Sequence, residues 1–137
     1  MLYAAQRKDG TWTGALYAEV TERIRAHHQG YEETLHPVLG IREEGGVIIA
    51  DLPGIDQLRA VMSCTRFQGR EALRQAGLFD QARQLIDDSQ DATMAGAWDE
   101  ASVWNRMSPF ILKMGGALGL TEDEIDDLFH CAAEITA

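Results

Sequence analysis

Residues 52–62 read Leu-Pro-Gly-Ile-Asp-Gln-Leu-Arg-Ala-Val-Met, and the pattern of the chain changes at this stretch. Leu52, Ile55, Leu58 and Val61 recur every three or four residues, as one apolar face of a helix requires. Before the stretch, short runs of aromatic and β-branched residues are separated by turn residues, whereas helical spacing continues after it. The sequence therefore predicts two domains, 1–51 and 52–137.

About five short helices are predicted after residue 52, and local signals set their ends. Four positions can begin a helix by accepting hydrogen bonds from its free N–H groups: Thr65 and Thr121, each in a capping box, Asp91, and Ser108 before Pro109. The helix that follows Asp91 is predicted to carry both Trp98 and Trp104. Tight joints between these helices predict a compact bundle with little room for a large cavity.

The N-terminal residues predict a β-hairpin. Leu2–Gln6 and Thr11–Tyr17 flank an Asp9-Gly10 pair, which is a typical hairpin turn. Because an isolated hairpin is only marginally stable, this one is expected to pack on the helices, on another chain or on a third strand. Val47–Ala50 is the candidate third strand, and Ile41–Glu43 is a candidate to pair with it.

Residues 19–37 give a weaker pattern. Val20 and Ile24 suit a short helix that Gly30 would end, and Tyr31–Pro37 is predicted to be a loop. The predicted fold class is thus mainly α (α+β), with a short N-terminal β-hairpin arm followed by a compact bundle of about five short helices.

Composition narrows the classes of protein. The chain has 137 residues, 45% of them hydrophobic and 25% charged, which is typical of a small globular protein and not of a disordered one. No apolar run approaches the roughly 18 residues that span a bilayer. The first residues, MLYAAQRKDG, resemble neither a signal peptide nor a transit peptide, so we expect a soluble protein made in the cytosol.

The net charge of −10 is concentrated in the second half of the chain. Residues 80–137 hold twelve acidic residues against Arg83, Arg106 and Lys113, a balance of −9. Nucleic acids and anionic membranes are therefore poor partners. Since such charge is costly to desolvate, the acidic last helix is expected to face solvent.

Residues that could carry catalysis lack the spacing that catalysis needs. Cys64 and Cys131 belong to no CxxC pair and are expected to be buried free thiols. His27 and His28 are adjacent and cannot face one point on a helix, so they do not form a metal site together. No calcium loop, phosphate loop or nucleophile motif is present. The sequence predicts no enzyme activity, no cofactor, no metal and no small-molecule substrate.

Three arginines form a regular pattern. Arg66, Arg70 and Arg74 follow one another at four-residue steps, which places them on one helix face. They are either a solvated face paired with the acidic last helix, or a surface that docks on an acidic protein partner. Trp12 and Tyr17, on the predicted hairpin, are candidate interface anchors, because aromatic side chains are enriched in protein interfaces.

The second half of the chain resembles a recurrent C-terminal segment of small bacteriophage and prophage proteins, often encoded among virion genes near the tail module. The stretches that carry the resemblance are residues 65–68 (TRFQ), 75–79 (QAGLF), 97–101 (AWDEA), 106–109 (RMSP) and 116–129 (GALGLTEDEIDDLF).

The resemblance implies a non-catalytic virion component or assembly accessory. We expect a small structural subunit, made in the bacterial host cytoplasm and bound in several copies to other phage structural proteins in the virion. Its place would be the tail, baseplate or fibre region, or the capsid as a cement protein. The alternative is an intracellular assembly chaperone or helical protein-protein interaction regulator that is not retained in the virion.

Overall fold

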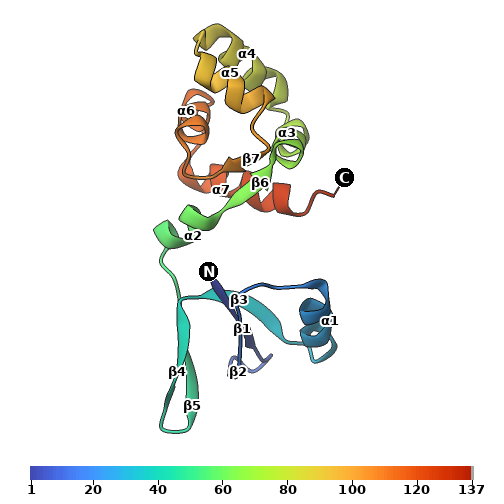
Figure 1. Cartoon of the computed structure of the whole chain (residues 1–137), viewed down its shortest axis with the longest axis vertical. Coiled ribbons are helices and arrows are strands. Elements are labelled where there is room, and N and C mark those ends of the chain that lie inside the picture. Colours follow the sequence, from blue (N-terminus) through green and yellow to red (C-terminus); the bar gives the residue numbers. More distant parts are fainter. Residues whose placement is uncertain (137) are drawn as a thin grey trace. The chain divides into compact units, whose positions relative to one another are not determined.

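The computed structural model describes residues 1–136, and the chain divides into two compact units (Figure 1). The N-terminal unit comprises Met1–Ile55, and the C-terminal unit begins at Asp56. The division lies a few residues after the boundary predicted at 51/52.

A three-stranded antiparallel sheet with the order β2-β1-β3 is the centre of the N-terminal unit. Its strands are β1 (Leu2–Gln6), β2 (Trp12–Tyr17) and β3 (Thr34–Val38). The hairpin expected from Asp9-Gly10 is present, since Tyr3 pairs with Tyr17 and Gln6 with Trp12. Asp9 accepts hydrogen bonds from the N–H and the hydroxyl of Thr11, and Gly10 has a φ of 90°, a region that favours glycine.

The third strand of this sheet is β3, where the sequence predicted a loop. Pro37 obscured this strand, because a proline cannot donate to a ladder. The proline is tolerated here because β3 is an edge strand. Pro37 lies opposite Tyr3 of β1. The short helix α1 (Glu22–Gly30) connects β2 to β3 and is capped by Thr21, which accepts from the Ile24 N–H.

The predicted third strand lies instead in a separate hairpin, where it pairs with Ile41–Glu43 as expected. β4 (Gly40–Glu44) pairs antiparallel with β5 (Val47–Asp51) through the turn Gly45-Gly46, where φ is 56° and 81°. Positive φ at both turn residues is the type I′ geometry that matches the twist of two paired strands. Gly14 of β2 lies against Ile48 of this hairpin, since a Cβ added to Gly14 would lie 3.9 Å from Ile48 Cδ1.

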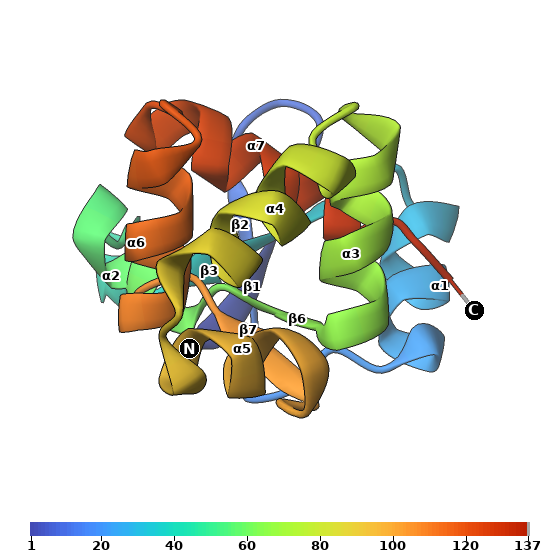
Figure 2. The same cartoon turned by 90° about the horizontal axis from the view of Figure 1, so that it is seen from above.

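The C-terminal unit consists of helices around a very short strand pair. Figure 2 shows α3 and α6 on opposite sides of this unit. The elements in chain order, after α2 (Ile55–Val61), are β6 (Ser63–Thr65), α3 (Arg66–Gln75), α4 (Phe79–Ser89), α5 (Ala92–Asp99), β7 (Val103–Asn105), α6 (Pro109–Ala117) and α7 (Glu122–Ala133). All four predicted N-caps, at Thr65, Asp91, Ser108 and Thr121, begin helices here.

The strands β6 and β7 were not predicted, and they correct the expectation of one helix from Asp91 past Trp104. Helix α5 ends at Asp99, and Trp104 lies on β7, opposite Cys64 of β6. The Trp104 ring packs directly against Gly69 of α3. Only a glycine leaves room for it, because a Cβ at this position would lie 2.3 Å from Trp104 Cε3. The indole N–H donates to the Ala97 carbonyl at 3.0 Å, so the buried ring has its polar atom satisfied.

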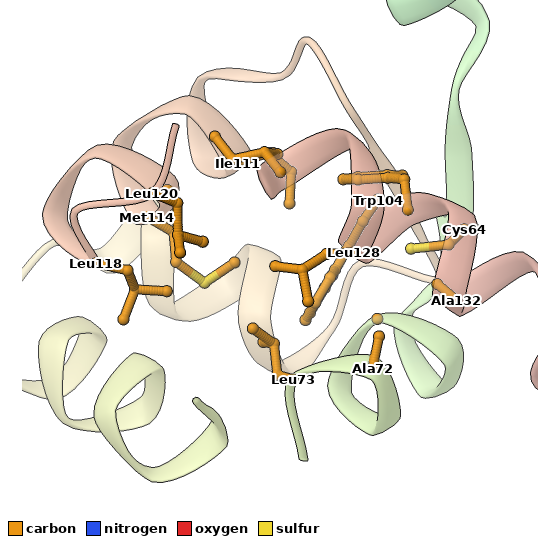
Figure 3. A pocket seen from close by; sticks show the side chains of 14 residues that line it. Cys64, Ala72, Leu73, Trp104, Ile111, Met114, Leu118, Leu120, Leu128 and Ala132 are labelled. Atoms are coloured by element: carbon orange, nitrogen blue, oxygen red, sulfur yellow. The ribbon is translucent and has the colours of Figure 1, made fainter. Parts of the chain in front are cut away.

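The core of the C-terminal unit is apolar and closely packed. Trp98, Trp104 and Phe110 form a run of ring contacts with centroids 5.5 and 5.1 Å apart. Beside it lies a cavity of only about 30 Å³, lined by Trp104, Met114 and Leu128 among others (Figure 3). This volume is comparable with the space of one water molecule. The interior of the unit therefore has no room for a sizeable ligand at this place.

The predicted fold class is wrong. Over the described residues the chain has seven helices and three small sheets, with 49% helix and 24% strand, which is a mixed α+β fold and not a clear bundle. The error has two sources: the N-terminal part holds five strands and not a single hairpin arm, and a strand pair lies among the C-terminal helices.

Candidate protein-binding site

Two of the three predicted arginines hold the C-terminal end of α5. Arg70 Nη2 donates to the carbonyl of Trp98 at 2.6 Å and to Asp99 Oδ1 at 3.1 Å, and Arg66 donates to the carbonyl of Asp99. The last carbonyls of a helix lack intrahelical partners and carry partial negative charge, so two guanidinium groups are well placed there. The stripe thus pairs with α5 and not with the acidic last helix.

Arg74, the third arginine, is exposed and lies 4.1 Å from the centroid of the Phe79 ring. It also pairs with Glu71 at 2.9 Å on its own helix. Beside the stripe is an open surface groove of about 540 Å³, lined by Thr65, Arg66, Phe67, Arg70, Arg74 and Ser102. Phe67 is about half exposed in it. Because Arg66 and Arg70 are bound to the end of α5, the groove offers one exposed cation, Arg74, beside one aromatic ring.

Arg70 is the most constrained residue of the stripe. Its guanidinium lies 5.0 Å from the Trp98 ring centroid, and its Nε is buried with no hydrogen-bond partner in the described structure. An unsatisfied buried donor costs roughly 1–3 kcal/mol. The contacts of this side chain are therefore mainly within the unit, and Arg74 is the arginine most available to a partner.

The predicted anchors Trp12 and Tyr17 both lie on β2, half-buried, but on opposite faces of the sheet. Trp12 pairs with Gln6 and Tyr17 with Tyr3, and positions 3 and 6 of one strand point to opposite faces. The Trp12 ring packs edge-on against His36, with centroids 5.8 Å apart. The two aromatic side chains therefore do not form one patch.

Tyr17 belongs to a polar triad that the sequence did not indicate. Its hydroxyl lies 2.8 Å from His28 Nε2, and His28 Nδ1 lies 2.9 Å from Glu33 Oε1. In the neutral imidazole, Nδ1–H donates to the carboxylate and Nε2 accepts from the tyrosine. His28 is 4% exposed, so these bonds fix α1 to the sheet and satisfy a buried polar ring.

A buried ion network joins three segments of the C-terminal unit. Arg106, which is fully buried, donates from Nε to Asp126 Oδ1 at 2.8 Å and from Nη2 to Glu122 Oε2 at 2.6 Å. Arg59 of α2 donates from Nε to Asp126 Oδ2 at 3.0 Å. Asp126 thus bridges two arginines that lie far apart in the sequence, Arg59 and Arg106.

The pKa of Asp126 follows from these neighbours. Burial alone would raise the pKa of this carboxyl, but hydrogen bonds from Arg59 and Arg106 outweigh it, and the pKa lies below its ordinary value of 3.8. The carboxylate is therefore ionised at neutral pH and compensates the buried Arg106 charge. Its role is structural, because the groups around it are already paired.

The cysteines and histidines do not gather. Cys64 and Cys131 are free thiols, Cys64 buried and Cys131 half-buried. Burial raises the pKa of the Cys64 thiol to about 11, so it is inert at neutral pH. No group of three or more His, Cys, Asp or Glu within residues 1–136 is arranged to hold a metal ion.

In the same residues, no helix has the length and apolar character that crossing a membrane requires.

The chain matches no family model, no curated protein and no solved structure. Of the residues that prove to be central, sequence reasoning named Arg66, Arg70 and Arg74 from their spacing but missed His28, Arg106 and Asp126. Two signals in the sequence could have pointed to Arg106: it is one of three basic residues in the last 58, and it precedes the Ser108-Pro109 cap.

Proposed function

We propose that this chain is a non-enzymatic structural subunit of a bacteriophage particle, which docks in several copies on a larger virion assembly. The proposal rests on the phage-like stretches between residues 65 and 129 and on one structural observation. That observation is the small N-terminal unit, which leaves strand edges and apolar side chains exposed. Its place would be the tail, baseplate or fibre region, or the capsid as a cement protein.

The N-terminal unit has little apolar core of its own. Its fully buried apolar residues, within the described part of the chain, are Ala4, Ala5 and Val38. Its large exposed apolar residues are more numerous: Leu16, Tyr31, Leu39, Val47, Leu52 and Ile55. A unit that hides small side chains and exposes large ones is suited to bury more surface against a partner.

Strand addition is the docking mode that this unit supports best. β2 is an edge strand, and β4 and β5 form a two-stranded sheet of which each strand is an edge. A free edge presents unpaired N–H and C=O groups on which an extended segment of another protein can pair. Pro37 blunts the opposite edge, β3. We therefore assign docking to β2 and to the β4–β5 hairpin, and recruitment of an acidic partner segment to Arg74.

Mass spectrometry of purified particles tests the proposal. We expect peptides of this chain in the mature virion, at a level that indicates several copies. Absence from the particle would overturn the structural reading and indicate an assembly chaperone or regulator, which acts only in the host cell.

A matched pair of variants tests the docking edge in particles assembled without the native chain. Leu16 of β2 and Leu112 of α6 are equally exposed, at 41% and 40%. Leu16→Lys places a charge on the proposed edge and should abolish incorporation, because a lysine on an edge strand disfavours pairing with a further strand. Leu112→Lys should incorporate normally. Equal incorporation of the two variants would contradict docking through β2.

A further inference from the structure

The acidic helix α7 has two different faces. Glu122, Asp123 and Asp126 pair with Arg59 and Arg106. Glu124 and Asp127, on the other face, form no ion pair within residues 1–136. The prediction that the acidic last helix faces solvent therefore describes only one of the two faces of α7, the one with Glu124 and Asp127.

Glu124 and Asp127 border a surface groove of about 600 Å³ between α7 and the end of α3. Three half-buried leucines, Leu78, Leu120 and Leu128, form its apolar part. None of the residues that line it in the described structure is lysine or arginine. The groove thus offers an apolar floor with uncompensated negative charge at its border.

Two further features keep this groove negative. The Thr121 N–H donates to the Glu124 carboxylate in the capping box, and this bond, with the nearby Thr121 hydroxyl, holds the pKa of Glu124 below its ordinary value. Helix α3 ends at Gln75, which also lines the groove, and the C-terminal end of a helix carries partial negative charge. Negative potential from both sides favours a cationic ligand and disfavours an acidic one.

We propose that this groove binds a basic amphipathic segment of a partner protein, whose apolar side chains contact the three leucines while its Lys or Arg side chains pair with Glu124 and Asp127. Such a segment is most simply a helix with apolar residues at i, i+3 and i+4, because helices bind in grooves by this pattern. This surface is separate from the strand edges of the N-terminal unit. The inference holds whether or not the chain is a virion subunit.

Cys131 provides a native reporter for the groove. It lines the groove, half-buried, with its thiol 3.4 Å from Gln75 Oε1, whereas Cys64 is buried and inert. Maleimide labelling of the folded chain at neutral pH therefore reports on Cys131. A bound segment should slow this labelling because it covers the thiol.

The experiment uses the full chain and two synthetic helices of about 15 residues, with identical patterns of leucine and either lysine or glutamate at the polar positions. At low salt, the Leu/Lys peptide should bind and slow Cys131 labelling by about tenfold at saturation, and the Leu/Glu peptide should have no effect. Added salt should weaken binding, since the charges involved are exposed. Failure of the Leu/Lys peptide to protect Cys131, or equal protection by both peptides, would overturn the proposal.

Two variants of equal charge change separate the groove from the general acidity of the chain. Asp127→Lys should weaken binding of the Leu/Lys peptide by about fivefold or more, because it replaces an attraction with a repulsion. Asp87→Lys, on the exposed side of α4 and outside the groove, should change it by less than about twofold. Equal effects would mean non-specific attraction.

A third variant guards against loss of folding as the cause. Ala76→Arg, at an exposed groove position, places a cation within the groove and should also block the peptide, while circular dichroism stays unchanged. If labelling of Cys131 instead slows as the chain itself is concentrated, the occupant is a second copy and the proposal is wrong.

Discussion

The two units of the chain are stabilised by different means. The C-terminal unit buries fourteen apolar side chains in one cluster, including two tryptophans and two phenylalanines. The N-terminal unit buries two alanines and a valine, together with His28 at the centre of the polar triad. Because it buries much less apolar surface, the N-terminal unit is expected to be the less stable of the two.

The C-terminal unit also carries a desolvation penalty, because the charged side chain of Arg106 is fully buried. An ion network of this kind contributes little net stability compared with an apolar core, but removal of one member leaves an uncompensated charge. The difference between the units therefore lies in what each loses on mutation: a charge partner or core packing in the C-terminal unit, and hydrogen bonds in the N-terminal unit.

The largest effect is expected from Asp126→Ala. This change removes the buried carboxylate that Arg106 and Arg59 share and leaves Arg106 paired with the exposed Glu122. It should lower the free energy of unfolding of the C-terminal unit by about 3–5 kcal/mol. Urea unfolding followed by hydrogen exchange of each unit is the measurement. The N-terminal amides should keep their protection. Asp127 is an exposed acid on the same helix with no ion pair among the described residues, and Asp127→Ala should change stability by less than about 0.5 kcal/mol.

The pH dependence of Asp126 gives a second check on the same network. Its pKa is depressed in the folded state, so its contribution is present above the ordinary value near 3.8 and is lost as the pH falls through the folded value. Unfolding of the native C-terminal unit should therefore become easier below about pH 4, and Asp126→Ala should reduce this dependence. An unchanged pH profile in the variant would assign acid sensitivity to other carboxylates.

Two helical glycines give effects of opposite sign in the C-terminal unit. A Cβ at Gly69 would lie 2.3 Å from the Trp104 ring, and Gly69→Ala should destabilise the unit by about 1–3 kcal/mol or more. A Cβ at Gly96 would meet nothing within 4 Å, and Gly96→Ala should stabilise α5 by about 0.5–1 kcal/mol. Thermal unfolding measured by tryptophan fluorescence compares them. If Gly69→Ala is neutral, the packing of Trp104 is looser than described.

The contact between Gly69 and Trp104 also shows why part of the fold could not be predicted from the sequence. Short-range signals were sufficient for the helix starts at Thr65, Asp91, Ser108 and Thr121, because capping depends on residues within one turn. Trp104 fits a helical spacing after Trp98 equally well. Its place on β7 is set by pairing with Cys64, forty residues earlier, and such a long-range contact leaves no local pattern.

The candidate site shows the same limit. The spacing of Arg66, Arg70 and Arg74 correctly puts them on one helix, but their binding of the α5 carbonyls depends on how α3 meets α5. The division of α7 into a paired and an unpaired face likewise depends on Arg59 and Arg106, which lie far from it in sequence. Charge counting could give the acidity of this helix but not its two faces.

In the N-terminal unit, the largest effect is expected from His28→Ala. The change leaves Tyr17 and Glu33 without their shared partner, and loss of such bonds costs about 1–3 kcal/mol. Exchange of amides in β1–β3 and α1 should quicken accordingly, while the C-terminal unit keeps its protection. The neighbouring His27 is exposed and serves as the control, since His27→Ala should leave exchange nearly unchanged. Equal effects would mean that the triad does not hold α1 to the sheet.

The smallest pair of effects compares one helix cap in each unit. Thr121 accepts from the Glu124 N–H at 3.1 Å, and Glu124 accepts from the Thr121 N–H at 3.0 Å, so Thr121→Ala removes half of a reciprocal pair. Thr21 makes a single longer bond, 3.3 Å from the Ile24 N–H. We expect Thr121→Ala to cost about 1 kcal/mol, confined to the C-terminal unit, and Thr21→Ala about half of that, confined to the N-terminal unit.

Hydrogen exchange of each unit in the two variants measures both values, with Thr→Ser substitutions as controls that retain the hydroxyl. The result bears directly on the comparison of the units. Because α1 packs through few apolar side chains, even a small loss at its cap should release most of its amides together with those of β3. Helix α7 packs Ile125, Phe129 and Ala132 into the core, so its loss should stay near the first turn. Wider release in α7 than in α1 would reverse the order of stability proposed for the two units.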